Sequence, residues 1–183
     1  MDLAAVGTDV ERVIVTQEQL RSKVAELAAR IDSDYKDRDL LLVGVLKGAI
    51  MAMADLTRAM QRNIDMDWMA VSSYGSGTKS SGVVRILKDL DRDITGRNIL
   101  IVEDIVDSGL TLSWLRANLM SRGAESVEIL AILRKPKAAK VEVECKYVGF
   151  DIPTDFVVGY GLDFNEKYRN LSFVGVLAKH MYS

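Results

Sequence analysis

The chain has 183 residues, enough for one domain with a substantial core and short for two. Hydrophobic residues make up 49% and charged residues 27%, as in an ordinary globular protein, and the net charge of −2 argues against a strongly basic face for duplex nucleic acid. Cys145 is the only cysteine, which excludes an intramolecular disulfide and a cysteine-rich metal site.

The beginning of the chain carries no targeting pattern. Residues 1–11 contain acids and lack a basic segment followed by an apolar one, so we expect no signal peptide. The apolar runs are far shorter than the roughly 18–20 residues that span a bilayer. We therefore expect a cytoplasmic protein without a membrane partner, with residues 1–10 flexible.

The first predicted helix begins after Thr16. Thr16 and Gln19 have the spacing of a capping box, in which each side chain satisfies the other residue's backbone N–H. Apolar residues then recur at helical spacing from Leu20 to Ile31. This pattern predicts an amphipathic helix with one buried face.

Short apolar runs and helical patterns then alternate. The runs predict strands at residues 40–46, 66–72, 83–87, 98–102, 127–133 and 156–158. The helical patterns cover residues 49–60 and 111–120, the second ending near Gly123. Small and polar side chains at residues 73–82 predict a long mobile loop. The alternation predicts one α/β domain over residues 1–183, with helices on both faces of a mainly parallel sheet.

The most informative pattern lies at residues 101–112. An apolar strand is followed there by Glu103, Asp104, two apolar residues, Asp107, Ser108, Gly109, Leu110 and Thr111. Open α/β sheets bind ligands beyond the carboxyl ends of their strands, and a helix N-terminus offers free N–H groups, so this turn predicts a phosphate site. Two acids would repel phosphate and are predicted to hold sugar hydroxyls or a divalent cation. The alternative is that Asp107 and Ser108 only cap the helix while the acids are solvated.

This string resembles the phosphoribosyl pyrophosphate-binding signature of type I phosphoribosyltransferases. The resemblance implies a single-domain fold with a central mainly parallel sheet, flanking helices, a small hood from the terminal segments and a mobile lid. It implies that Glu103 and Asp104 hold the ribose hydroxyls and a metal, and that residues 107–111 cradle the 5′-phosphate. Asp107 is then the expected general base, taking the proton from N7 of a purine.

Three shorter motifs resemble the hypoxanthine-guanine members of that family. Lys47 and Gly48 follow a strand, as in a pyrophosphate loop that often carries a non-proline cis peptide. Ser73 and Tyr74 begin the loop that resembles the catalytic lid. Lys135 matches a lysine that donates to O6 of the base; an ammonium only donates, so it suits a carbonyl and not the amino group of adenine. Taken alone, Lys47 and Lys135 would be interpreted as solvated lysines, and the loop after Ser73 is equally compatible with a disordered hairpin tip.

The segment 156–169 resembles the C-terminal part of the same enzymes. By that resemblance Phe156 stacks on the purine, Val157 binds it through backbone groups and Leu162 lines the pocket. Asp163 contacts the base edge and helps to hold magnesium, and Arg169 reaches the pyrophosphate. Without the resemblance, Phe156 and Val157 would be interpreted as core strand residues.

The implied reaction displaces pyrophosphate from C1 of the ribose by N9 of hypoxanthine, and of guanine as well, to give IMP or GMP. Mg²⁺ is the implied cofactor, and a homodimer or homotetramer the implied assembly. The sequence alone leaves hypoxanthine-only and dual use open. Two other hypotheses are a phosphoribosyltransferase for xanthine, orotate or adenine, and a regulator that keeps the donor cradle but binds RNA. The second needs a basic patch, which the scattered lysines do not predict.

Overall fold

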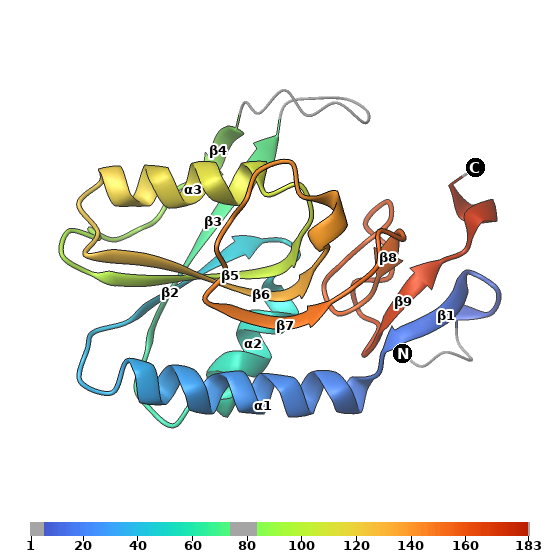
Figure 1. Ribbon diagram of the computed structural model, residues 1–183, viewed down its shortest axis with the longest axis horizontal. Coiled ribbons are helices and arrows are strands. Elements are labelled where there is room, and N and C mark those ends of the chain that lie inside the picture. The colour runs from blue at the N-terminus through green and yellow to red at the C-terminus, as the bar shows by residue number, and fades with distance from the viewer. Residues whose placement is uncertain (1–5, 74–83, 183) are drawn as a thin grey trace.

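The computed structural model describes residues 6–73 and 84–182, which form a large and a small sheet (Figure 1). The strands of the large sheet are β2 (Leu41–Leu46), β3 (Asp65–Ser73), β4 (Val84–Lys88), β5 (Asn98–Val106), β6 (Ser126–Arg134) and β7 (Tyr147–Asp151). Their order is β4-β3-β2-β5-β6-β7, and neighbours run parallel except for the antiparallel pair β3–β4. The predicted mainly parallel α/β sheet is confirmed, with β7 as a strand that the sequence did not predict.

Helices cover both faces of this sheet. The helices α1 (Gln17–Asp34) and α2 (Ile50–Ala59) lie on one face, and α3 (Leu110–Ser121) lies on the other (Figure 1). The capping box at the start of α1 is confirmed: the Thr16 hydroxyl accepts from the Gln19 N–H at 3.2 Å, and the Gln19 side chain accepts from the Thr16 N–H at 2.8 Å. Within the described residues, no helix is long and apolar enough to cross a membrane.

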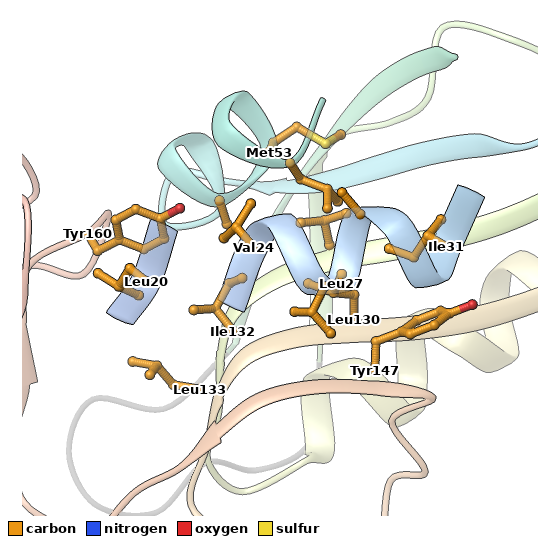
Figure 2. Packing of buried hydrophobic residues seen from close by; sticks show 14 of the residues in the cluster. Leu20, Val24, Leu27, Ile31, Met53, Leu130, Ile132, Leu133, Tyr147 and Tyr160 are labelled. Carbon is orange, nitrogen blue, oxygen red and sulfur yellow. The ribbon is translucent and has the colours of Figure 1, made fainter. Parts of the chain in front are cut away.

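The core is double-sided because the central strand is buried on both faces. Along β5, Leu100 and Val102 pack toward α1 and α2, whereas Ile99 and Ile101 pack toward α3. All four are fully buried, and each contributes about 1.5–3 kcal/mol of apolar burial. Figure 2 shows the hydrophobic cluster on the side of α1 and α2. The labelled residues are Leu20, Val24, Leu27, Ile31, Met53, Leu130, Ile132, Leu133, Tyr147 and Tyr160.

A smaller antiparallel sheet lies beside the large one and is built by segments near the two ends of the chain (Figure 1). Its strands are β1 (Val10–Val15), β9 (Val174–Leu177) and β8 (Val157–Val158), in that order. This is the hood that the family resemblance implies. Residues 1–5 lie outside the described part of the chain, while Val6 and Val10 are buried in the core cluster of the hood.

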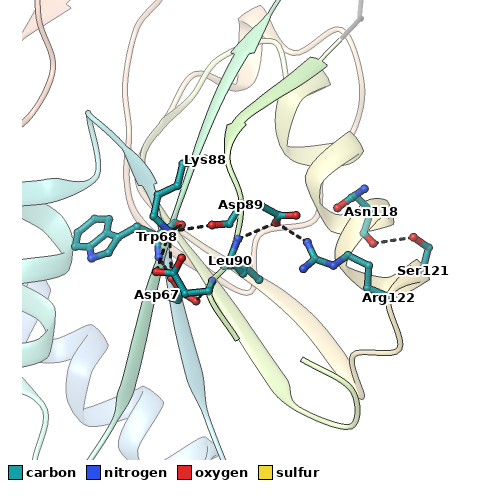
Figure 3. Close-up of polar contacts among 9 residues, drawn as sticks. Asp67, Trp68, Lys88, Asp89, Leu90, Asn118, Ser121 and Arg122 are labelled. Atoms are coloured by element: carbon teal, nitrogen blue, oxygen red, sulfur yellow. Dashed lines mark hydrogen bonds and ion pairs between the residues drawn. The ribbon is translucent and has the colours of Figure 1, made fainter. Parts of the chain in front are cut away.

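A polar cluster ties β3 and β4 to the end of α3 (Figure 3). The buried Asp67 carboxylate accepts from the N–H groups of Trp68 at 2.7 Å and Asp91 at 2.8 Å. Arg122, which follows α3, donates to the Asp89 carboxylate at 2.7 Å. Asp67 is near the amino end of β3, so this cluster supports the sheet away from the carboxyl ends of the parallel strands.

Candidate active site

The carboxyl ends of the neighbouring parallel strands β2, β5 and β6 lie at one edge of the large sheet. Lys47 follows β2, Asp107 follows β5 and Lys135 follows β6. The topology therefore brings together three segments that the sequence singled out separately. β5 runs on to Val106, four residues beyond its predicted end, so the two acids belong to the strand itself.

The side chain of Asp104 is buried and that of Glu103 is partly buried. Burial raises the pKa of Glu103 well above its ordinary value, and the neighbouring Asp104 charge raises it further. Burial likewise raises the pKa of Asp104 to about 6, against the lowering effect of the hydrogen bond from the Ile105 N–H. The Oε2 atom of Glu103 is buried without a hydrogen-bond partner among the described residues. The alternative that these acids are solvated is therefore wrong.

Such a pair suits a ligand that brings hydroxyl donors or a cation. An unpaired buried carboxylate is unfavourable, and a ribose diol or a divalent ion supplies the missing partner. The part of the chain that the structure describes contains no group of three acidic, histidine or cysteine side chains that could hold a metal by itself. The residues thus fit a divalent ion that takes its remaining ligands from a bound phosphate compound.

The turn from Asp107 to Thr111 leads from β5 into α3. Gly109 is the N-cap residue of α3, its φ angle is +78°, and the helix start has no side-chain cap. A Cβ at Gly109 would lie 2.6 Å from the Val141 carbonyl oxygen, which only glycine avoids. The alternative that Asp107 and Ser108 cap the helix is therefore wrong, and the first N–H groups of α3 remain available for an anion.

A cavity of about 260 Å³ lies over this turn. Its lining includes Glu103, Asp107, Ser108 and Thr111, together with Leu46 at the end of β2. The predicted sugar-binding acid and the predicted phosphate cradle thus face one hollow.

Lys135 is buried, with 7% of its surface exposed, although Pro136 and Lys137 next to it are exposed. Its N–H donates to the Val106 carbonyl at 2.9 Å, and its Nζ lies 3.6 Å from Oδ2 of Asp107. The alternative that Lys135 is one of several solvated basic residues is wrong. The geometry brings an ammonium donor to the carboxylate predicted to act as base.

The loop after β2 packs closely against Asp104 and against the segment 156–169. The peptide bond between Leu46 and Lys47 is cis, as the resemblance implies. A Cβ at Gly48 would overlap the Asp104 carboxylate, lying 2.6 Å from its Cγ. A Cβ at Gly161 would overlap the Gly48 carbonyl oxygen. The absence of side chains at both positions lets the loop, the strand β5 and the segment 156–169 meet.

The segment 156–169 presents one aromatic ring and a cluster of charges. Phe156 is 41% exposed and Val157 is buried, while Leu162 packs against the main core. Arg169 forms an ion pair with Asp163 at 2.9 Å. The charge of Arg169 lowers the pKa of Asp104, and that of Asp163 raises it. The sequence thus found the residues of this segment that lie near the acids.

Two residues at the site were missed. Glu166 forms an ion pair with Lys47 at 3.0 Å, and the ring of Tyr182 lies 5.5 Å from that of Phe156. Glu166 falls inside a recognised motif but has no assigned part there, and Tyr182 carries no pattern of its own. Ser73 ends β3, whereas Tyr74 and the rest of the predicted lid lie outside the described residues.

Comparisons with known proteins agree with this geometry. A family model described as the phosphoribosyl transferase domain matches residues 14–165. The hypoxanthine-guanine phosphoribosyltransferase of Mycobacterium tuberculosis is 56% identical over 180 residues, covering 95% of this chain and 89% of that protein. The enzyme of the same name from Bacillus subtilis is 49% identical over 174 residues, covering 95% and 97%.

A solved structure gives the same result for the fold. The crystal structure of a hypoxanthine phosphoribosyltransferase from Staphylococcus aureus aligns with a TM-score of 0.95 at 42% identity and covers 100% of both chains. The chain therefore belongs to the type I phosphoribosyltransferase family, among its hypoxanthine-guanine members.

Proposed function

We propose that the chain transfers the 5-phosphoribosyl group of phosphoribosyl pyrophosphate to N9 of hypoxanthine and guanine. The products are IMP or GMP and pyrophosphate, and the reaction serves purine salvage. The observation that carries the proposal is the meeting of Lys135 and Asp107, 3.6 Å apart, beside an uncapped helix N-terminus. One edge of the sheet thereby offers a phosphate cradle, a candidate base and a donor for a carbonyl oxygen.

The donor's sugar phosphate fits the end of β5. The N–H groups of residues 108–111 and the hydroxyls of Ser108 and Thr111 bind the 5′-phosphate, with the positive end of the α3 dipole behind them. Glu103 and Asp104 accept hydrogen bonds from the ribose hydroxyls, which satisfies the otherwise unpaired Oε2 of Glu103. The sugar is then held with its C1 atom turned toward the base.

The pyrophosphate group fits between the loop after β2 and the hood. The ammonium of Lys47, the backbone of Gly48 and the guanidinium of Arg169 bind its oxygens. Two Mg²⁺ ions are proposed, one beside Glu103 and Asp104 and one beside Asp163, each completed by ligands from the donor. They would supply the charge neutralisation that makes pyrophosphate a competent leaving group. The residues of the chain position the pyrophosphate group and exclude water from it.

The purine is read by groups with different chemistry. Phe156 stacks on the ring, which is worth roughly 1–3 kcal/mol for a nucleic-acid base, and Val157 binds its edge through the backbone, with Leu162 lining the pocket. Lys135 donates to O6, so a base with an amino group at that position meets a donor where it needs an acceptor. Asp107 accepts the N7 proton as N9 attacks C1 with inversion.

The assembly and location belong to the proposal as well. A homodimer or homotetramer in the cytoplasm is expected for such an enzyme, and no nucleic acid or membrane takes part.

The test is an incubation of the full chain with phosphoribosyl pyrophosphate, Mg²⁺ and each of hypoxanthine, guanine, xanthine and adenine. We expect IMP and GMP together with an equimolar amount of pyrophosphate, AMP at a rate far below that of IMP, and loss of activity when the metal is chelated. Turnover of adenine as fast as that of hypoxanthine would contradict the proposal. So would turnover of orotate in a parallel incubation, or a salt-sensitive shift of RNA by a chain that converts none of the bases.

A further inference from the structure

Glu166 lies between the two cations that the proposed function assigns to pyrophosphate. Its Oε2 accepts a hydrogen bond from the Nζ of Lys47 at 3.0 Å, and its Oε1 lies 3.3 Å from Nη2 of Arg169. Lys47 belongs to the loop after β2, whereas Arg169 belongs to the segment that connects β8 to β9. One carboxylate therefore joins cations from two different parts of the fold.

The backbone around Glu166 presents this carboxylate in an uncommon conformation. Asn165 and Glu166 have φ angles of +50° and +63°, in the left-handed region that residues with a side chain rarely adopt. The Asp163 carboxylate fixes the turn by accepting a hydrogen bond from the Glu166 N–H at 2.8 Å. Backbone strain of this kind persists where the surroundings over-determine it, and it clusters at ligand sites.

The contacts of Arg169 divide into fixed and exchangeable ones. Its Nη1 donates to the Gly161 carbonyl at 2.7 Å, and Nη2 pairs with Asp163 at 2.9 Å. The Arg169 side chain is only 21% exposed, but that of Glu166 is 62% exposed. Exposed ion pairs are weak, so Glu166 can leave while Gly161 and Asp163 keep the guanidinium in place. The hydrogen bond from Lys47 lowers the pKa of Glu166, consistent with a carboxylate that stays ionised.

We propose that Glu166 pairs with Lys47 and Arg169 when no ligand is present, competes there with the pyrophosphate group, and yields both cations to it. The inference rests on the proposed function, which names Lys47 and Arg169 as the pyrophosphate-binding residues. Once displaced, Glu166 leaves a negative charge beside the bound pyrophosphate. That charge weakens binding of the pyrophosphate product and favours its release.

The test is the affinity of the full chain for inorganic pyrophosphate with Mg²⁺, measured by titration calorimetry in Glu166→Gln. Glutamine keeps the size of the side chain and removes its charge. We expect the dissociation constant to fall about two- to fivefold, the range that exposed ion pairs support, and the gain to shrink at high salt. In Glu166→Gln the KM for phosphoribosyl pyrophosphate falls with it, while the KM for hypoxanthine stays within about twofold.

The matched control is Glu26→Gln on α1. Glu26 pairs with Lys23 at 2.6 Å, and its side chain is 63% exposed, so the substitution changes the net charge of the chain equally at a similar surface position. We expect no change in pyrophosphate binding there. An equal tightening in Glu26→Gln would attribute the effect to net charge and overturn the inference.

A second variant, Glu166→Ala, tests whether the carboxylate of Glu166 competes with pyrophosphate or whether its side chain only stabilises the turn. Both Glu166 variants bind pyrophosphate more tightly if the carboxylate competes with it. An unchanged or weaker affinity in both overturns the inference. If the unsubstituted chain binds no pyrophosphate, the proposed function fails with it. If that chain binds pyrophosphate and converts hypoxanthine while the variants bind no tighter, only the inference fails.

Discussion

Gly48→Ala is expected to remove activity while leaving the protein folded. A Cβ at Gly48 would overlap Oδ2 of Asp104 and lie 2.6 Å from its Cγ, whereas ordinary contact begins at 3.4 Å, so the two groups must move apart by at least 0.8 Å. Asp104 cannot swing aside freely, because it is buried and accepts a hydrogen bond from the Ile105 N–H at 2.7 Å. Relief of the clash therefore displaces the loop after β2, or breaks the hydrogen bond of Asp104 and displaces this acid, and either change alters the site.

The magnitude follows from the geometry of catalysis. Misplacing a reacting group by about 1 Å lowers rates by about 10²-fold, so we expect kcat/KM for phosphoribosyl pyrophosphate to fall about a hundredfold. Overpacking of this size lowers the free energy of unfolding by about 1–3 kcal/mol. Steady-state kinetics and denaturant unfolding of the same preparation measure the two effects separately.

Gly96→Ala is the matched control. Gly96 has a φ angle of +72°, and a Cβ there would meet no atom within 4 Å. The substitution therefore adds the same methyl group with backbone strain of about 1 kcal/mol, but no clash at the site. We expect the Tm to fall by about 2–4 °C with kcat/KM unchanged. A Gly48→Ala protein that keeps kcat/KM within about threefold of the unsubstituted chain would refute the reasoning.

Three further outcomes are expected. Asp107→Asn lowers kcat about 10²–10⁴-fold, far more than it weakens donor binding, and equal turnover would remove Asp107 from the role of base. Burial raises the pKa of Asp104 to about 6 in the folded protein, against an ordinary 3.8, so the folded state holds this proton more tightly than the unfolded state does. The metal-free protein therefore loses stability as the pH rises from about 4 to above 6. Asp104→Asn should therefore gain up to about 3 kcal/mol at pH 7, and urea unfolding at pH 4 should show the gain vanish. Tyr182→Ala, which removes the ring beside Phe156, raises the KM for hypoxanthine about threefold to tenfold, whereas Tyr182→Phe and the exposed control His180→Ala leave it unchanged.

Local patterns in the sequence predicted the local elements well. The capping box of Thr16 and Gln19 needs only four consecutive residues, and the central strand is apolar because both of its faces are covered. The strands β1 and β9 were not predicted. They pair with each other across most of the chain, with Val10 opposite Leu177, and a short strand of that kind has no strong pattern of its own.

The same division holds for the candidate site. The acids lie near the carboxyl end of β5, the helix turn follows β5, and Lys135 follows the neighbouring parallel strand β6, so their convergence follows from the topology. The pairing of Glu166 with Lys47 depends instead on how two loops that lie 119 positions apart in the sequence approach each other. Such contacts between distant exposed side chains leave no spacing in the sequence from which they could be predicted.

The central claim is that Lys135, buried 3.6 Å from Asp107, selects a 6-oxopurine as the acceptor. The most direct measurement is the ratio of kcat/KM for hypoxanthine to that for adenine, in the unsubstituted chain and in Lys135→Ala. A hydrogen bond from a charged group contributes about 1.5–3 kcal/mol, so the account predicts that this ratio falls about 10- to 150-fold in the variant, through loss of hypoxanthine turnover. A ratio that is the same in both proteins would contradict it.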